Sequence, residues 1–212
     1  IPVSSLSKDP FKSISCRRCE AKLVSHLFCF ECSNLQPLSS SKDYFSALGV
    51  PQIYELDQNL LEERFQQIVG ELHPDFYINS SKEDQRLSER ASTLLNKAFE
   101  VLKDPFKRAK HLITMRGKEL EWNERILPKG FLEEMFALQE QLDEMQENQN
   151  LEGVKQMWNM MENQRENLKL ELVRSFKLLE NVENSSEVIE EIQKNLNAEH
   201  YLQRLFERIP DE

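Results

Sequence analysis

Four cysteines lie within 17 residues, in the arrangement Cys16-x2-Cys19 followed by Cys29-x2-Cys32. Each C-x-x-C pair can direct two thiolates at one ion, and four thiolates complete the closed tetrahedral shell of a structural zinc site. The spacing therefore predicts a structural Zn2+ held by all four cysteines. A closed shell leaves no open position for a substrate, so we do not expect catalysis at this metal.

Other chemistry stays open for this segment. The thiols could instead form two disulfides or stay free, and His26 could compete as a ligand. The two pairs could also act as redox dithiols, but the sequence lacks the βαβ pattern expected around such a motif. Only nine residues separate the pairs, so the module cannot bury a core of its own. A bound metal would then supply most of its folding free energy.

The tripeptide His73-Pro74-Asp75 is the second group of residues that could do chemistry. Proline restricts the backbone of a turn, and the imidazole and carboxylate beside it can both make polar contacts with a partner. A cap-and-turn cluster without a partner is one alternative. A catalytic acid–base pair is another, but two side chains on one tight turn lack the pocket and third group that catalysis needs. We therefore expect no enzymatic activity from this turn.

The elements around this tripeptide form a predicted helical hairpin. A short helix ends at Gly49, and a second helix begins after Asp57, a good N-cap residue. That helix ends at His73, because the residue before a proline is disfavoured in α geometry. A third helix carries a long apolar stripe and stops at Asp104, and a fourth covers residues 106–115.

Three more helices are predicted over residues 129–147, 151–181 and 187–209, separated by the turn-rich segments ENQN and NVENSS. Each carries an apolar stripe at helical spacing, and an antiparallel three-helix bundle is the simplest way to bury the three stripes. The predicted fold class is therefore all-α, with a helical hairpin, a carboxy-terminal bundle and a small amino-terminal zinc-binding module.

Some apolar residues of the predicted bundle lie off these stripes. At about 100° per residue, Leu132 lies about 90° and Phe136 about 130° from the core direction of the first helix. On the last helix Tyr201 lies about 180° from Ile192, on the solvent side. Exposed aromatic residues gathered on acidic helices indicate a partner site, although scattered surface hydrophobic residues are the ordinary alternative.

Composition narrows the functional classes. The chain of 212 residues has a net charge of −10, and residues 116–212 hold 12 basic against 22 acidic side chains. This balance disfavours a nucleic-acid partner that is bound through its phosphates. The 5 glycines form neither a Rossmann fingerprint nor a P-loop. No apolar run approaches the roughly 20 residues that span a bilayer, so no membrane partner is expected.

The order DYFSALGV, a second helix, HPD and NKAFEVLKDPFKRA resembles the J domain of Hsp40-type cochaperones over about residues 43–115. The resemblance implies that His73, Pro74 and Asp75 dock on an Hsp70 and stimulate its ATPase. The second helix departs from the common pattern because it lacks a run of Lys and Arg. Phe76 also follows the motif where Lys is frequent. These departures favour a dedicated Hsp70 over docking to any Hsp70.

A J domain followed by FLEEMFALQEQLDEM and an acidic bundle resembles the HscB family, the J-type cochaperones of iron–sulfur cluster assembly, over about residues 43–212. The four-cysteine module is similar to that of animal mitochondrial members. The family resemblance implies that the bundle binds the cluster scaffold protein (IscU/ISCU type) through an apolar patch with acidic neighbours. The matching positions are Leu132, Phe136, Glu140, Glu144 and Tyr201.

The predicted organisation is a flexible tail at 1–15, the zinc module and a linker at 16–42, the J domain at 43–115, a linker at 116–127 and the bundle at 128–212. The implied function is delivery of the scaffold to a mitochondrial Hsp70 and stimulation of its ATPase, which promotes cluster transfer. A zinc-ribbon adaptor for nucleic acid or protein, without chaperone activity, is the alternative.

The implied location is the mitochondrial matrix, with the cytoplasm as a second location. Because the chain starts at Ile1, we expect any targeting peptide to lie upstream. Nucleic acid and membranes are not expected as partners, and a weak homodimer is left open.

Overall fold

The computed structural model describes residues 14–38, 43–120, 123, 125–181 and 185–209. Most of the predicted tail, residues 39–42 of the first predicted linker, residues 121, 122 and 124 of the second, residues 182–184 of the predicted turn NVENSS and residues 210–212 lie outside the described residues. The described part is mostly helical, which confirms the predicted all-α class. The chain divides into two compact units, Ile1–Arg108 and Ala109–Glu212.

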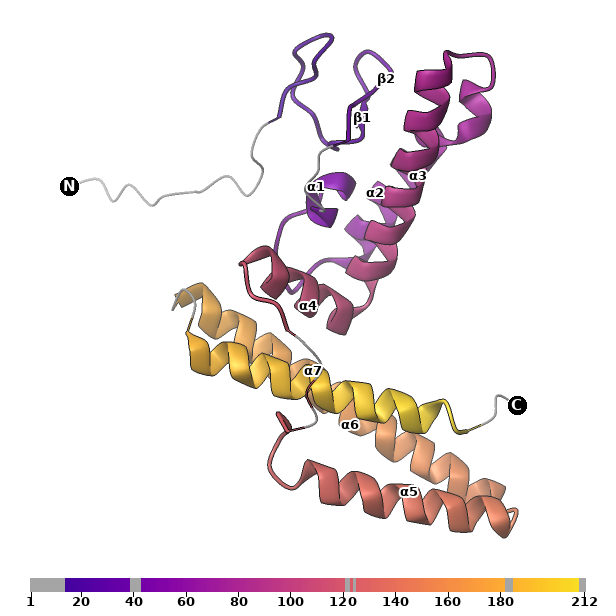
Figure 1. The fold of residues 1–212 in the computed structure, drawn as a ribbon, viewed down its shortest axis with the longest axis vertical. Helices are drawn as coiled ribbons and strands as arrows, with labels where there is room; N and C mark the ends of the chain where they lie inside the picture. Colours follow the sequence, from indigo (N-terminus) through magenta and orange to yellow (C-terminus); the bar gives the residue numbers. More distant parts are fainter. Residues whose placement is uncertain (1–13, 39–42, 121–122, 124, 182–184, 210–212) are drawn as a thin grey trace, which may run out of the picture. The chain divides into compact units, whose positions relative to one another are not determined.

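The first unit is built on three helices, α1 (Tyr44–Leu48), α2 (Gln58–Leu72) and α3 (Lys82–Lys103), of which α2 and α3 form the predicted hairpin (Figure 1). Local capping explains where the long helices begin. The Asp57 carboxylate accepts from the first backbone N–H groups of α2, and Ser81 Oγ accepts from the backbone N–H of Asp84 in α3. Apolar side chains facing one another across the helices make the core, among them Phe45, Leu48, Leu61, Ile68, Leu72, Leu95 and Leu102.

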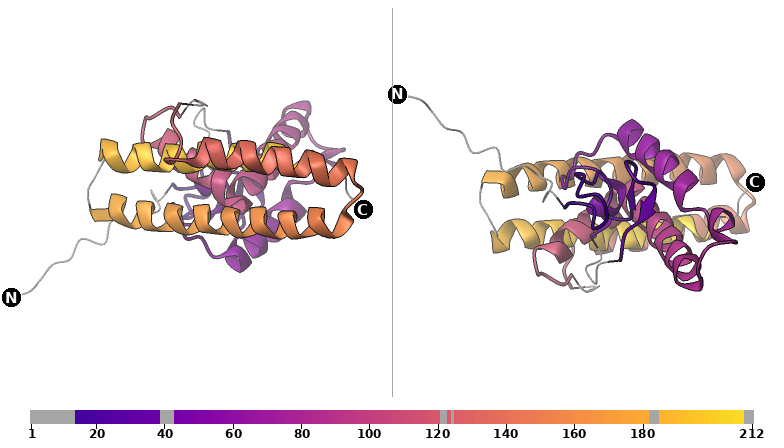
Figure 2. Two further views of the ribbon diagram at one scale, coloured as in Figure 1. Left: turned by 90° about the horizontal axis from the view of Figure 1, so that it is seen from below. Right: turned by 90° about the horizontal axis from the view of Figure 1, so that it is seen from above.

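A small antiparallel hairpin carries part of the cysteine module. Strand β1 (Phe28–Cys29) pairs with β2 (Asn34–Leu35), with Phe28 opposite Leu35. Strand β1 contacts α2, and β2 contacts α3. The right-hand view of Figure 2 shows the cysteine module in indigo together with the helices of the first unit. The cysteine module therefore packs on the helices, and their core covers the apolar face that it cannot cover alone.

Helix α4 (Pro105–Met115) begins one residue before the predicted start. Proline is well suited to the first helical position. The Asp104 carboxylate accepts from the backbone N–H groups of Phe106 and Lys107, each at 2.8 Å, and so caps the helix.

The second unit contains the predicted bundle of α5 (Phe131–Glu147), α6 (Leu151–Asn181) and α7 (Ser186–Phe206). Helices α6 and α7 run side by side and α5 packs against both (Figure 1). The predicted core residues of α5 are buried, and so are their partners on the other helices, including Met161, Leu172, Leu179, Ile192 and Leu202. None of the described helices combines the length and the apolar character needed to cross a membrane.

The segment that precedes the bundle is attached to α7. The Asn197 side chain is buried, and its Nδ2 donates to the carbonyl oxygens of Asn123 (3.0 Å) and Ile126 (2.8 Å). These residues lie in the segment predicted as a linker, so this part of it is fixed on the bundle.

Candidate metal centre and docking surfaces

The four predicted cysteine ligands come together in the structure. Their sulfur atoms all lie within 4.8 Å of one another, with Cys16 and Cys32 at 3.6 Å and Cys19 and Cys29 at 3.6 Å. A tetrahedral ion with metal–sulfur bonds of about 2.3 Å places its sulfurs about 3.8 Å apart, so the donor set fits a metal ion. All four are free thiols rather than disulfides, and His26 is not part of the cluster.

The two C-x-x-C turns are followed by the same backbone conformation. The residue directly after each pair, Glu20 and Ser33, has a left-handed backbone with φ of 62° and 50°. Such a conformation is uncommon outside glycine, and here it follows the second thiolate of both pairs. Hydrogen bonds from the backbone N–H groups of Cys19 and Arg18 lower the pKa of the Cys16 thiol to about 6, against the opposing effect of burial. The thiolate that a metal needs is therefore favoured at Cys16.

The junction between this module and α1 is centred on the buried Ser25. Ser25 Oγ donates to the carbonyl oxygen of Ala47 at 2.6 Å and accepts from the backbone N–H of Leu27 at 3.1 Å. The backbone N–H of His26 donates to the carbonyl oxygen of Ser46 at 3.1 Å. Sequence reasoning missed this junction, because no periodic pattern links residues 22 positions apart.

The His73-Pro74-Asp75 tripeptide lies exposed between α2 and α3, where Pro74–Tyr77 form a single 3-10 turn. The backbone N–H of Asp75 donates to His73 Nδ1 at 3.3 Å, and the Asp75 carboxylate lies 3.4 Å from the same nitrogen. The imidazole thus caps the turn. Beyond the motif, the side chains of Phe76 and Ile78 are 71% and 65% exposed.

The end of α2 is tied to α3 just before the motif. The carbonyl oxygen of Leu72 accepts from Ser88 Oγ at 2.6 Å and from Ser92 Oγ at 2.9 Å. Carbonyl groups at a helix C-terminus have no partner within the helix. Because α3 supplies two donors to this carbonyl, the turn that follows is held in place.

A groove between α5 and α7 has a volume of about 460 Å³. Its walls include three of the five residues predicted to bind the scaffold, Leu132, Phe136 and Tyr201. Phe136 is 60% exposed, and Leu132 is half-buried. Tyr201 was predicted to face solvent, but it is half-buried, because α5 packs on that side and brings the Phe131 ring to 6.3 Å between centroids.

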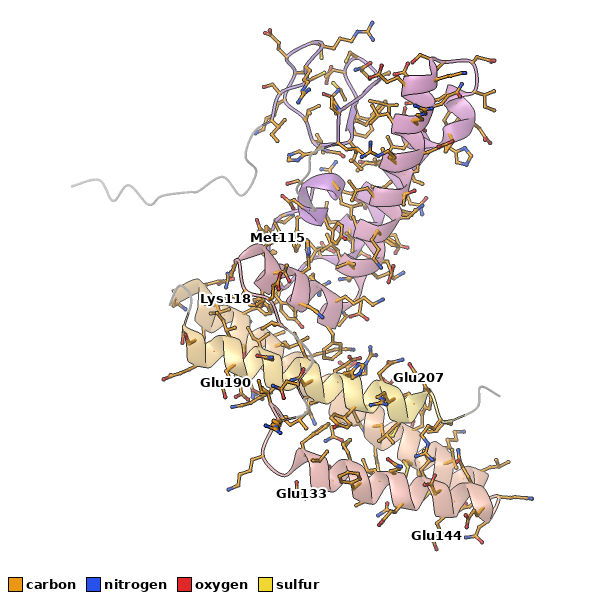
Figure 3. All side chains as sticks on the ribbon, viewed as in Figure 1. Met115, Lys118, Glu133, Glu144, Glu190 and Glu207 are labelled. Carbon is orange, nitrogen blue, oxygen red and sulfur yellow. The ribbon has the colours of Figure 1, made fainter. Side chains whose placement is uncertain are left out.

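The two predicted acidic residues, Glu140 and Glu144, are exposed on α5 but do not line the groove. Figure 3 labels Glu144 near the end of α5 and Glu207, which does line the groove, near the end of α7. The groove also contains two arginines that sequence reasoning missed, Arg204 and Arg208. They lie three and seven positions after Tyr201, so helical spacing from that tyrosine would have identified them.

Sequence comparison finds relatives among known co-chaperones. The iron–sulfur cluster co-chaperone protein HscB of Mus musculus is 31% identical over 136 residues, which is 64% of this chain and 58% of that protein. The co-chaperone protein HscB homolog of Shewanella halifaxensis (strain HAW-EB4) is 36% identical over 104 residues, 49% of this chain and 60% of that protein. The matches thus span about three fifths of these relatives. No protein-family model matches the chain.

Structural comparison finds the same fold. The crystal structure of human co-chaperone protein HscB matches with a TM-score of 0.73 and 24% identity, over 92% of this chain and 96% of that one. The chaperone HscB from Vibrio cholerae matches with a TM-score of 0.58 and 22% identity, over 78% of this chain and 98% of that one. The chain is therefore similar in sequence to HscB co-chaperones and shares the fold of the HscB structures.

Proposed function

We propose that the chain is a non-enzymatic J-type co-chaperone of iron–sulfur cluster assembly, in which residues 43–115 act as the J domain and 128–212 as the scaffold-binding bundle. The exposed His73-Pro74-Asp75 turn, fixed to α3 through the Leu72 carbonyl, carries the proposal. The mouse and Shewanella relatives are co-chaperones, which supports a co-chaperone role. In this proposal the turn docks on a mitochondrial Hsp70 in the matrix and stimulates its ATPase.

The surroundings of the turn favour a dedicated Hsp70. The exposed face of α2 carries Glu62, Glu63 and Glu71, which cannot provide the basic docking surface common in J domains. Phe76 and Ile78 instead add apolar area beside the motif. Apolar contacts depend on shape more than on charge, so they discriminate between related partners.

The second partner is the iron–sulfur cluster scaffold protein (IscU/ISCU type), which we place in the groove between α5 and α7. Leu132, Phe136 and Tyr201 provide apolar contacts there, while Glu140 and Glu144 act outside the groove as an acidic rim. One chain that holds the scaffold and presents the turn raises the local concentration of the scaffold at the Hsp70. ATP hydrolysis occurs in the partner and promotes transfer of the cluster.

We assign Zn2+ to the four thiolates, because a closed four-cysteine set is typical of structural zinc. Bound zinc would hold the two C-x-x-C turns together. The chain's own contribution is the Ser25–Ala47 hydrogen bond and the buried side chains of Leu27 and Phe28, which fix the module on the helices.

The direct test is the steady-state ATPase rate of a mitochondrial Hsp70 with this chain and the scaffold. We expect the wild type to stimulate the rate and His73→Gln to abolish the stimulation. His200→Gln, the same change at an exposed position on α7, is the matched control and should stimulate normally. If neither the wild type nor the control stimulates, the chain acts as an adaptor without chaperone activity.

A further inference from the structure

The charges of the α5–α7 groove differ from those of the bundle around it. Residues 116–212 are strongly acidic, with 12 basic and 22 acidic side chains. The groove walls nevertheless include two arginines, Arg204 and Arg208, against one acidic residue, Glu207. Because Asp143 neutralises Arg208, Arg204 is the arginine of these walls that can meet a partner's charge, and a guanidinium beside apolar walls suits a contact that is both apolar and anionic.

The two arginine side chains differ in their hydrogen bonds and ion pairs. Arg208 Nη2 forms an ion pair with the Asp143 carboxylate, and its backbone carbonyl accepts from Gln146 Nε2 at 3.0 Å. Arg208, which lies just after α7, therefore joins the end of that helix to α5. Arg204 is exposed and, within the described part of the chain, takes part in no ion pair or side-chain hydrogen bond.

Arg204 lies one helical turn after Tyr201, so its guanidinium and the tyrosine ring belong to the same wall. The apolar side chains of Leu132 and Phe136 form the wall on α5. An incoming side chain packed between these walls would be removed from water, and its carboxylate would meet a guanidinium that has no competing partner. Arginine binds carboxylates through two parallel hydrogen bonds, which fixes orientation as well as charge.

We propose that Arg204 is a specificity-determining residue of the groove and binds an acidic side chain of the scaffold protein that lies beside the partner's apolar contact residues. This inference rests on the proposed scaffold site. The groove would then prefer an anionic contact, whereas the rim residues Glu140 and Glu144 would attract a basic surface of the partner.

Binding of the purified scaffold protein to Arg204 variants tests the proposal, with affinity measured by calorimetry at two salt concentrations. Arg204→Gln should weaken binding about tenfold and reduce its salt dependence, because one charge-assisted contact is lost. Arg204→Glu should weaken it further, since like charges then meet. Arg204→Lys should retain part of the affinity, because it keeps the charge but loses the fork geometry. Arg116→Glu, an exposed arginine that does not line the groove, should bind as the wild type does.

Phe136→Ala and Tyr201→Ala show whether a negative result concerns Arg204 alone or the groove as the scaffold site. If both weaken binding while Arg204→Gln and Arg204→Glu bind like the wild type, the role of Arg204 is wrong and the groove remains the scaffold site. Tighter binding by Arg204→Glu would also refute it, because the partner would then be basic at this point. If Phe136→Ala and Tyr201→Ala have no effect, the scaffold does not bind in the groove, and both proposals fail.

Discussion

Gly49 is the position where one methyl group should disturb the junction between the cysteine module and the helices. The residue ends α1 with φ of 64°, and its own backbone N–H donates to the carbonyl oxygen of Phe45. A Cβ atom added there would lie 2.3 Å from the carbonyl oxygen of Val24 and 3.0 Å from its carbonyl carbon. Because the obstacle is backbone, the strain cannot be relieved by rotating a side chain.

The expected cost of Gly49→Ala has two parts. The left-handed backbone costs an alanine about 1–2 kcal/mol relative to glycine. Moving the Val24 carbonyl also shifts Ser25, whose fully buried bond to Ala47 measures 2.6 Å. Weakening a buried hydrogen bond costs about 1–3 kcal/mol. The alanine also lowers the conformational entropy of the unfolded chain, which offsets about 0.4–1 kcal/mol of the loss. Together these effects predict a loss of roughly 1–5 kcal/mol in the stability of the first unit.

Hydrogen exchange read by mass spectrometry measures this loss segment by segment. Gly117→Ala is the control for the backbone part, because Gly117 has φ of 76° but nothing within 4 Å of its Cβ position. It should cost only about 1–2 kcal/mol in its own unit. Gly70→Ala, in α2 with open space around it, should stabilise the first unit by about 0.5–1 kcal/mol. If Gly49→Ala costs no more than Gly117→Ala, the packing of the module against α1 is not as described.

Ser88→Ala removes one of the two donors to the Leu72 carbonyl, and it should speed hydrogen exchange across residues 73–78 and cost about 1 kcal/mol; unchanged exchange would contradict the anchoring. Lysine hydrogen bonds lower the pKa of Glu100 to about 2, so its ionised form stabilises the fold above the ordinary carboxyl pKa and loses this effect as the pH falls toward 2. Glu100→Gln should therefore lower the urea midpoint at pH 7 but not at pH 2, and an equal difference at both would be inconsistent with the shift. Cys29→Ser, or removal of the metal by a chelator, should abolish stoichiometric zinc binding and raise hydrogen exchange in α1, because module and helix share buried contacts.

Local signals in the sequence predicted most of the helices. Several boundaries of α1, α2 and α3 could be predicted without knowledge of the neighbouring helices, because residues at the boundary itself determine them. These residues are Gly49 after α1, Asp57 before α2 and the pair Asp104-Pro105 after α3. The spacing of the two cysteine pairs likewise predicted that the four sulfur atoms lie close together, since a metal site requires all of its ligand atoms to meet at one ion.

Contacts between helices could not be predicted in the same way. Angles around a single helix placed Tyr201 on the solvent side, but they contain no information about α5, which covers it. Helical spacing from Tyr201 points to Arg204, but only the packing of α5 shows that both residues line one groove. The Ser25 junction was hidden for a related reason, because a buried serine pairs with a backbone carbonyl that any residue could supply.

The position of the cysteine module in the chain determines the order in which the protein can assemble. All four cysteines leave the ribosome before α1, α2 and α3 exist, and domains fold from the N-terminus as they are made. The metal site can therefore close first, while Ser25, Leu27 and Phe28 still face water. When the helices follow, they meet a hairpin that already exposes an apolar face of fixed shape. A bound metal would thus make the smallest part of the protein a template for the fold of the larger part.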